Sequence, residues 1–265
     1  QVKPVEALAF LEQNVAPVAL SDEFCKKYGG YDNSGLIVDC GTEVAGALFC
    51  LDLTPSALEE AVRRGCNLII THHPAIFAGV KHLSLAAGSA TACVAECVRR
   101  GISVISMHLN FDAAPCGIDY HLMLGLGGKK ELALMCPLSA GGYGRLFNVR
   151  PQPFEDFCKH VQTEFQSSRC RFYAAREHAR VNTVVSCCGA GCDDESINFA
   201  TGAGADTFVS ADIKHHHITA LLAAGINVVE LTHYSSEIYG LGRIYAAINA
   251  DMPFPVSFYK QVNLL

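Results

Sequence analysis

Two adjacent histidines, His72 and His73, follow the apolar stretch NLIIT and precede a proline. In a regular strand, neighbouring side chains point to opposite faces, so two diverging imidazoles do not easily serve one ion. They can instead serve two neighbouring ions, one each. Dinuclear sites hold their ions about 3.5–4 Å apart, and a bridging carboxylate is usual there. The pair therefore predicts part of a dinuclear metal site, and the rest of the chain has to supply the carboxylate.

A second motif, SMHLNFDAAP, spaces His108, Asn110 and Asp112 by two residues. In an extended chain, residues two apart share a face. The spacing predicts a nitrogen ligand or acid–base group and a carboxylate on the same side. His108 is therefore a candidate for proton transfer, and Asp112 is a candidate bridging ligand.

A third motif, THYSSE, places His233 and Glu237 four residues apart, where an apolar pattern with helical spacing begins. Residues four apart lie on one face of a helix, one turn from each other. The first turn of a helix also favours an anionic side chain. The two residues form a predicted two-ligand unit for a metal, and Glu237 is a second candidate for the bridging carboxylate.

Three histidines and two carboxylates suit Zn²⁺, Mn²⁺, Fe or Ni²⁺ better than Mg²⁺ or Ca²⁺, which prefer oxygen ligands. Each motif alone also has a structural interpretation. A single histidine at a strand end is more often structural, and a His–Glu pair four residues apart arises by chance on many helices. The run KHHH at 214–217 is as compatible with a solvated surface as with a site. The joint occurrence of the motifs at equivalent strand ends favours a centre of two divalent ions.

The elements that carry these motifs repeat one pattern. Three predicted helices end at Gly65, Gly101 and Gly225, and each is followed by a short β-branched strand and then a histidine. Glycine can supply the left-handed residue that closes a helix. Short apolar strands separated by helices predict parallel pairing and an α/β fold. Ligands in such folds gather at the carboxyl ends of the strands, where these histidines are expected.

Two α/β halves are predicted, residues 1–128 and 129–265. The segment 124–153 is rich in Gly and Pro and is interpreted as the join between them. A helix is predicted over 154–165. The closing stretch PVSFYKQV is predicted to be a strand, and it is a candidate for exchange into the first half.

The composition is that of a globular protein. Half of the 265 residues are hydrophobic, 17% are charged, and the net charge is −6. Without a basic patch, nucleic-acid binding is not expected. No apolar run approaches the roughly 18 residues of a membrane helix, so no membrane association is expected. The first residues resemble neither a secretory nor a transit segment, and a cytoplasmic location is predicted.

Thirteen cysteines, an odd number without a CxxC pair, argue against a disulfide framework. Cys187, Cys188 and Cys192 form the tightest group. They are interpreted as buried small hydrophobes, because free cysteine commonly behaves in this way.

Six segments of the sequence, in order, resemble the NIF-three-like family, also called type-two GTP cyclohydrolase I homologues. The segments are YDNSGLIVD (31–39), LDLT (51–54), ITHHPAIF (70–77), MHLNFDAAPCGID (107–119), GAGADTFVSADIKHH (202–216) and THYSSE (232–237). The resemblance covers nearly the whole chain. It implies two similar, intertwined three-layer α/β/α domains with a dinuclear metal site between them. It also implies a homohexamer built as a trimer of dimers.

The resemblance also implies roles for particular residues. The family's metal ligands fall on His72, His73, Asp112, His233 and Glu237. Its histidine at the head of the HTNxD motif falls on His108, near the metals. Its histidine in the GDIKYH motif falls on His216, with Asp212 as the acid. The sequence departs from the family at three places, Leu109, Thr232 and Ser210–Ala211, and none of them removes a ligand.

Two functions are compatible with these features. The first is a hydrolase that uses a metal-bridged hydroxide on a small phosphoester or nucleotide, with His108 or His216 moving the proton. Attack on a purine ring carbon would account for the cyclohydrolase label. The second is a non-enzymatic metal-binding adaptor, carrier or regulatory scaffold, because fold and metal do not fix function. A structural protein with core histidines is a third interpretation, and it predicts no bound metal.

Overall fold

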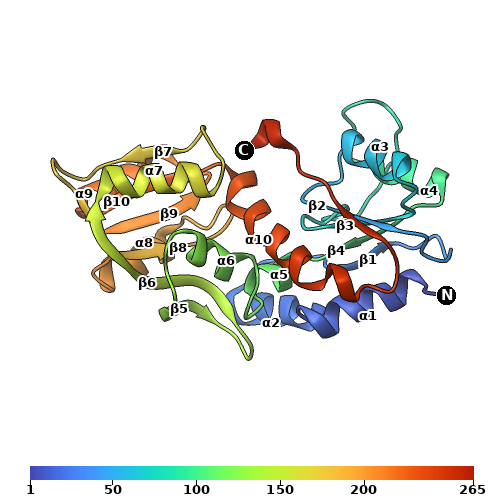
Figure 1. The fold of residues 1–265 in the computed structure, drawn as a ribbon, viewed down its shortest axis with the longest axis horizontal. Helices are drawn as coiled ribbons and strands as arrows, with labels where there is room; N and C mark the ends of the chain where they lie inside the picture. The colour runs from blue at the N-terminus through green and yellow to red at the C-terminus, as the bar shows by residue number, and fades with distance from the viewer. The chain divides into compact units, whose positions relative to one another are not determined.

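The computed structural model describes residues 1–265 and has an α/β architecture with two sheets (Figure 1). The chain divides into two compact units. The first unit comprises residues 1–111 and 241–260, and the second comprises residues 112–240 and 261–265. These units differ from the predicted division between residues 128 and 129. The chain passes from one unit to the other three times, so no single cut separates them.

The sheet of the first unit has five strands in the order β1-β4-β3-β2-β11. The strands are β1 (Gly35–Val38), β2 (Ala47–Cys50), β3 (Leu68–Thr71), β4 (Ser103–Ser106) and β11 (Val256–Phe258). The predicted parallel pairing is found between β2, β3 and β4. The closing strand β11 joins β2 in parallel, whereas β1 runs antiparallel to β4. A segment near the end of the chain therefore completes the first sheet.

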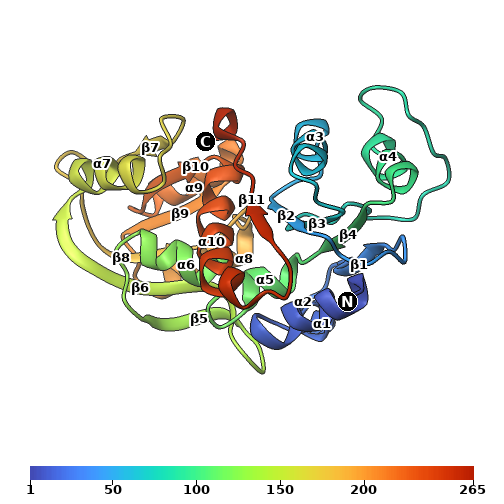
Figure 2. The same cartoon turned by 45° about the vertical axis from the view of Figure 1, so that its right-hand side comes forward.

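Helices cover both faces of this sheet. Helices α3 (Pro55–Arg63) and α4 (Ala92–Arg100) lie on one side, and α1 (Pro4–Asn14) and α2 (Val18–Tyr28) lie on the other (Figure 2). The core under α3 and α4 includes Leu48, Ile69 and Val104, one from each parallel strand. Both helices are followed by the predicted glycines in the left-handed region, Gly65 at φ 69° and Gly101 at φ 68°.

The sheet of the second unit has six strands in the order β5-β6-β8-β9-β10-β7. The strands are β5 (Glu131–Pro137), β6 (Gly142–Pro153), β7 (Arg171–Tyr173), β8 (Arg180–Ser186), β9 (Thr207–Ala211) and β10 (Asn227–Leu231). Strands β8, β9 and β10 are parallel. The interpretation of 124–153 as a join is wrong, because β5 and β6 form an antiparallel hairpin that extends this sheet. Gly141, with φ 69°, lies in the hairpin turn between the two strands.

The second sheet is also covered on both faces. Helices α8 (Asp194–Gly202) and α9 (His215–Ala223) pack over an apolar core that includes Phe208 and Val228. Helices α6 (Ile118–Gly125) and α7 (Phe154–Glu164) contact β6 and β8. An imidazole of α7, His160, lies 2.8 Å from the carbonyl oxygen of Gly125 at the end of α6. The predicted helix over 154–165 is confirmed as α7.

Two helices contain boundaries between the units. Helix α5 (Leu109–Ala113) and helix α10 (His233–Ile248) each begin in one unit and end in the other. Two short 3₁₀ helices, η1 (Asn249–Asp251) and η2 (Val262–Leu264), follow α10. None of the helices has the length and apolar character needed to span a bilayer. All thirteen cysteines are free thiols.

Candidate metal centre

The histidines singled out by the sequence lie at the carboxyl ends of parallel strands. Strand β3 ends at Thr71 and is followed by His72 and His73, and β4 ends two residues before His108. In the second unit, β10 is followed by His233, the first residue of α10. The repeated order of helix, glycine, strand and histidine is therefore a structural repeat.

Three imidazoles of the first unit, His72, His73 and His108, form what we call the histidine cluster. Their nitrogen ligand atoms all lie within 4.8 Å of one another, close enough that they could bind a metal ion. Their ring centroids are 5.1–5.7 Å apart. The expectation that the adjacent pair diverges is wrong. Strand β3 ends at Thr71, so the pair lies in a bend where the alternation of a strand no longer applies.

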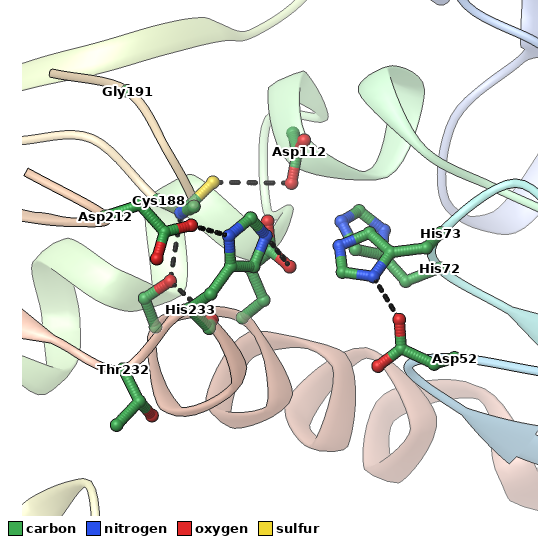
Figure 3. A network of polar contacts seen from close by, with 12 residues as sticks. Asp52, His72, His73, Asp112, Cys188, Gly191, Asp212, Thr232 and His233 are labelled. Carbon is green, nitrogen blue, oxygen red and sulfur yellow. Dashed lines mark hydrogen bonds and ion pairs between the residues drawn. The ribbon is translucent and has the colours of Figure 1, made fainter. Parts of the chain in front are cut away.

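Each imidazole of the histidine cluster is held through its Nδ1 atom. Nδ1 of His72 lies 2.8 Å from the carbonyl oxygen of Met107. Nδ1 of His73 lies 2.5 Å from Asp52 (Figure 3), and Nδ1 of His108 lies 2.7 Å from Asp32. A carbonyl or carboxylate oxygen can only accept, so Nδ1 donates and Nε2 is the unprotonated nitrogen of the neutral ring. Metal-binding histidines are typically oriented in this way by an acceptor behind the ring. The cluster therefore fits a metal bound through Nε2.

Sequence reasoning missed Asp52 and Asp32 as partners of these imidazoles. Asp52 follows β2, the parallel neighbour of β3, so the strand-end argument would have found it. Asp32 precedes β1, and it reaches the same edge because β1 is antiparallel to β4. Burial raises the pKa of Asp32, but hydrogen bonds from His108 and Ser34 outweigh burial and lower it. Asp32 therefore stays ionised as the acceptor of His108.

In the second unit, Asp112, Glu237, His233 and Asp212 form what we call the carboxylate cluster. His233 lies between two acids, with Nδ1 2.6 Å from Asp212 (Figure 3) and Nε2 3.2 Å from Glu237. An oxygen of Asp112 and an oxygen of Glu237 lie within 4.8 Å of each other. His233 and Glu237 stand one turn apart at the start of α10, as their spacing predicts. This cluster combines carboxylates with an imidazole and also has the donors of a metal site.

The chain around Asp112 is helical, so the predicted extended stretch from 108 to 112 is wrong. Strand β4 has already ended at Ser106, and Leu109–Ala113 form α5. Asn110 is buried and does not join either cluster. Its backbone N–H donates to Ser21 at 2.8 Å, and its side-chain amide donates to the carbonyl of Ala16 at 3.1 Å. Asn110 therefore anchors the helices of the first unit.

His216 lies apart from the carboxylate cluster. It is exposed in the first turn of α9, and its ring lies 4.1 Å from that of His217. The acid that the family resemblance assigns to it, Asp212, instead accepts from His233. Asp212 holds this position with φ 49°, a left-handed conformation that is costly for a residue with a side chain. Such strain is typical of residues fixed for a functional reason.

The two acids control the charge of His233. Burial by itself lowers the pKa of His233, but Glu237 and Asp212 outweigh it through hydrogen bonds and charge and raise the pKa to about 9. The protonated ring therefore stabilises the metal-free fold at pH values below its unfolded pKa, and this stabilisation is lost as the pH rises through about 9. A metal bound through Nε2 has to displace this proton.

Replacement of Asp212 tests whether this acid raises the pKa of His233. In metal-free protein, Asp212→Asn is expected to lower the pKa of His233 from about 9 toward the usual histidine value, because the amide carries no charge. An NMR titration of the imidazole signals measures the shift. Asp194→Asn is the matched control, because Asp194 contacts a different imidazole, His217, at 3.3 Å. An unchanged His233 titration in the Asp212 variant would contradict the assignment.

Comparison with known proteins places the chain in a wider group. The sequence profile of the family described as Duf34/NIF3 (NGG1p interacting factor 3) matches residues 15–263. A GTP cyclohydrolase 1 type 2 homolog of Clostridium acetobutylicum is 26% identical over 238 residues, which cover 88% of this chain and 85% of the relative. NGG1-interacting factor 3 of Saccharomyces cerevisiae is 26% identical over 230 residues, which cover 78% of this chain and 79% of the relative.

Solved structures show the same fold. A hypothetical protein of Staphylococcus aureus superposes with a TM-score of 0.82 at 24% identity, and the match covers 98% of this chain and 97% of the other. A Bacillus cereus protein related to NIF3 also gives 0.82, at 17% identity and with the same coverage. At these identities the likeness concerns the fold alone.

Proposed function

Because the chain belongs to the Duf34/NIF3 family, we propose that it is a dinuclear-metal-dependent hydrolase of a small nucleotide or phosphoester substrate. One repeated arrangement carries the proposal. The three proposed histidine ligands, His72, His73 and His233, each have Nδ1 on an oxygen acceptor. This orientation sets Nε2 as the ligand atom. The name GTP cyclohydrolase 1 type 2 homolog, carried by relatives, supports a nucleotide as the substrate.

The proposed ligands are three imidazoles and two carboxylates from both clusters: His72, His73, Asp112, His233 and Glu237. The histidine cluster brings nitrogen donors, and the nearby acids Asp52 and Asp32 are already engaged by imidazoles. A carboxylate that bridges two ions therefore has to come from Asp112 or Glu237. This donor set suits two ions of Zn²⁺, Mn²⁺, Fe or Ni²⁺.

When bound, the two ions would supply Lewis acidity and an activated water. Asp112 and Glu237 balance their charge. His108 keeps one orientation because its Nδ1 donates to Asp32, so its Nε2 is the proposed proton carrier of the reaction.

Metal content and turnover test the proposal together. Wild-type protein is expected to hold about two divalent ions per chain and to hydrolyse a member of a nucleotide and phosphoester panel. His72→Ala is expected to lose at least one ion. Its turnover is expected to fall by more than the ~10–100-fold that is typical when a residue hydrogen-bonded to a metal ligand is replaced. His82→Ala, an exposed histidine outside both clusters, is the control. A folded wild-type protein that holds no metal would contradict the metal centre.

A second function has one observation in its favour. The yeast relative is named for an interaction with NGG1, which is a binding role. We therefore also propose a metal-binding adaptor as the alternative, and a full metal load without turnover on the panel would support it over the hydrolase. The homohexamer implied by the family resemblance stays a prediction.

A further inference from the structure

The turn after β8, residues Cys187–Gly189, is fixed by hydrogen bonds on both sides of the chain. The backbone N–H of Cys188 donates to Asp119 at 2.9 Å, and its carbonyl accepts from the hydroxyl of Tyr143 at 2.6 Å. The next N–H, of Gly189, donates to Ser236 at 2.9 Å. Only 2% of Cys188 is exposed. The position of this cysteine is therefore set by the fold.

The thiol of Cys188 faces a proposed ligand. Its Sγ donates to Oδ1 of Asp112 at 3.3 Å (Figure 3). Asp119, the acceptor of the Cys188 N–H, is itself held by two further hydrogen bonds. It accepts from Arg145 at 2.5 Å and from the N–H of Gly144 at 2.9 Å. A buried chain of contacts thus runs from Arg145 through Asp119 and Cys188 to Asp112, all in the second unit.

The neighbouring cysteine behaves differently. Cys187 is fully buried in the apolar cluster of the second unit, beside Val185 and Phe208. The interpretation of these cysteines as small hydrophobes therefore describes Cys187. It does not describe Cys188, whose sulfur is hydrogen-bonded to a carboxylate.

We infer that Cys188 is a positioning residue of the proposed metal centre, holding the carboxylate of Asp112 in its ligating orientation. The thiol donates to Oδ1 and so restrains the rotation of the Asp112 carboxylate. A thiol is a weak donor, so its main effect is to fix orientation. Hydrogen bonds behind a ligand commonly set metal affinity in this way. The inference rests on the proposed metal centre and adds a residue to it.

Three variants of the full chain test the inference by titration of metal-free protein with Zn²⁺ against a competing chromophoric chelator. Cys188→Ala is expected to lower the affinity for Zn²⁺ by ~10–100-fold, because the donor to Asp112 is lost. Cys188→Ser keeps a donor and is expected to restore most of the affinity. Cys187→Ala removes the same atoms one residue away and is expected to leave the affinity at the wild-type value.

Equal affinities in Cys188→Ala and Cys187→Ala would overturn the inference. If Cys188→Ala fails to fold, the Co²⁺ spectra of the wild type and of Cys188→Ser show whether Cys188 ligates the metal or only positions Asp112. The two spectra are expected to coincide, whereas a thiolate-to-cobalt band lost in the serine variant would make Cys188 a ligand and overturn its positioning role. Wild-type protein that binds no metal contradicts the proposed function itself, so the two failures are distinguishable.

Discussion

Arg145→Leu is expected to lower the free energy of unfolding by about 3–5 kcal/mol, because it leaves the carboxylate of Asp119 buried without its cation. The two side chains are 1% and 0% exposed, and their closest atoms are 2.5 Å apart. Urea unfolding measures the loss. The double variant Asp119→Asn with Arg145→Leu is expected to recover part of it, because the amide is neutral and still accepts a hydrogen bond.

The loss should also depend on pH. Burial raises the pKa of Asp119, and this outweighs the opposing effects of Arg145 and the N–H of Cys188. A carboxyl whose pKa is higher in the folded state favours folding most below its unfolded pKa, and this contribution is lost as the pH rises. Without Arg145 the pKa rises further, so the loss in Arg145→Leu should be smaller near pH 5 than near pH 8.

Arg63→Leu provides the comparison. Arg63 pairs with Glu60 at 2.7 Å on the exposed face of α3, where solvent screens the charges. Its replacement is expected to leave the free energy of unfolding close to the wild-type value. If Arg145→Leu were as mild as Arg63→Leu, the buried pair would have no structural role.

The strands and their terminal histidines were predictable because they depend on local signals. A glycine that closes a helix, a β-branched stretch and a polar residue after it occur within about ten residues, and β3, β4 and β10 all follow this order. The argument that ligands gather at the carboxyl ends of parallel strands applies equally to Asp52, which follows β2. The pair His233 and Glu237 was also predictable, since it depends only on the pitch of a helix.

The missed features depend on pairing between distant segments. Asp32 reaches His108 because β1 runs antiparallel to β4, and no local signal near residue 35 gives that direction. The hairpin of β5 and β6 was hidden by glycines that resemble those of a linker. The division of the chain depends on α10, which continues from one unit into the other. The helical spacing of its apolar residues predicts α10, but it does not show in which unit each half of the helix packs.

A single methyl group at Gly189 is expected to disrupt metal binding without removing any donor atom. Gly189 has φ 61°, and a Cβ atom there would lie 2.5 Å from Oε1 of Glu237 and 3.4 Å from Nε2 of His233. Only 2% of Glu237 is exposed, so its carboxylate has little room to retreat. Gly189→Ala is therefore expected to displace Glu237 and to lose at least one of the two proposed ions, measured as metal per chain.

Gly204→Ala separates the backbone effect from the displacement of the ligand. Gly204 has φ 68°, and a Cβ atom there would have nothing within 4 Å. Both variants are expected to lose about 1–2 kcal/mol of stability from the left-handed backbone, because alanine disfavours this region. Only Gly189→Ala should also lose metal. Full metal content in both variants would mean that Glu237 is not a ligand, and an equal loss in both would mean that strain of the backbone, and not the contact with Glu237, disturbs the centre.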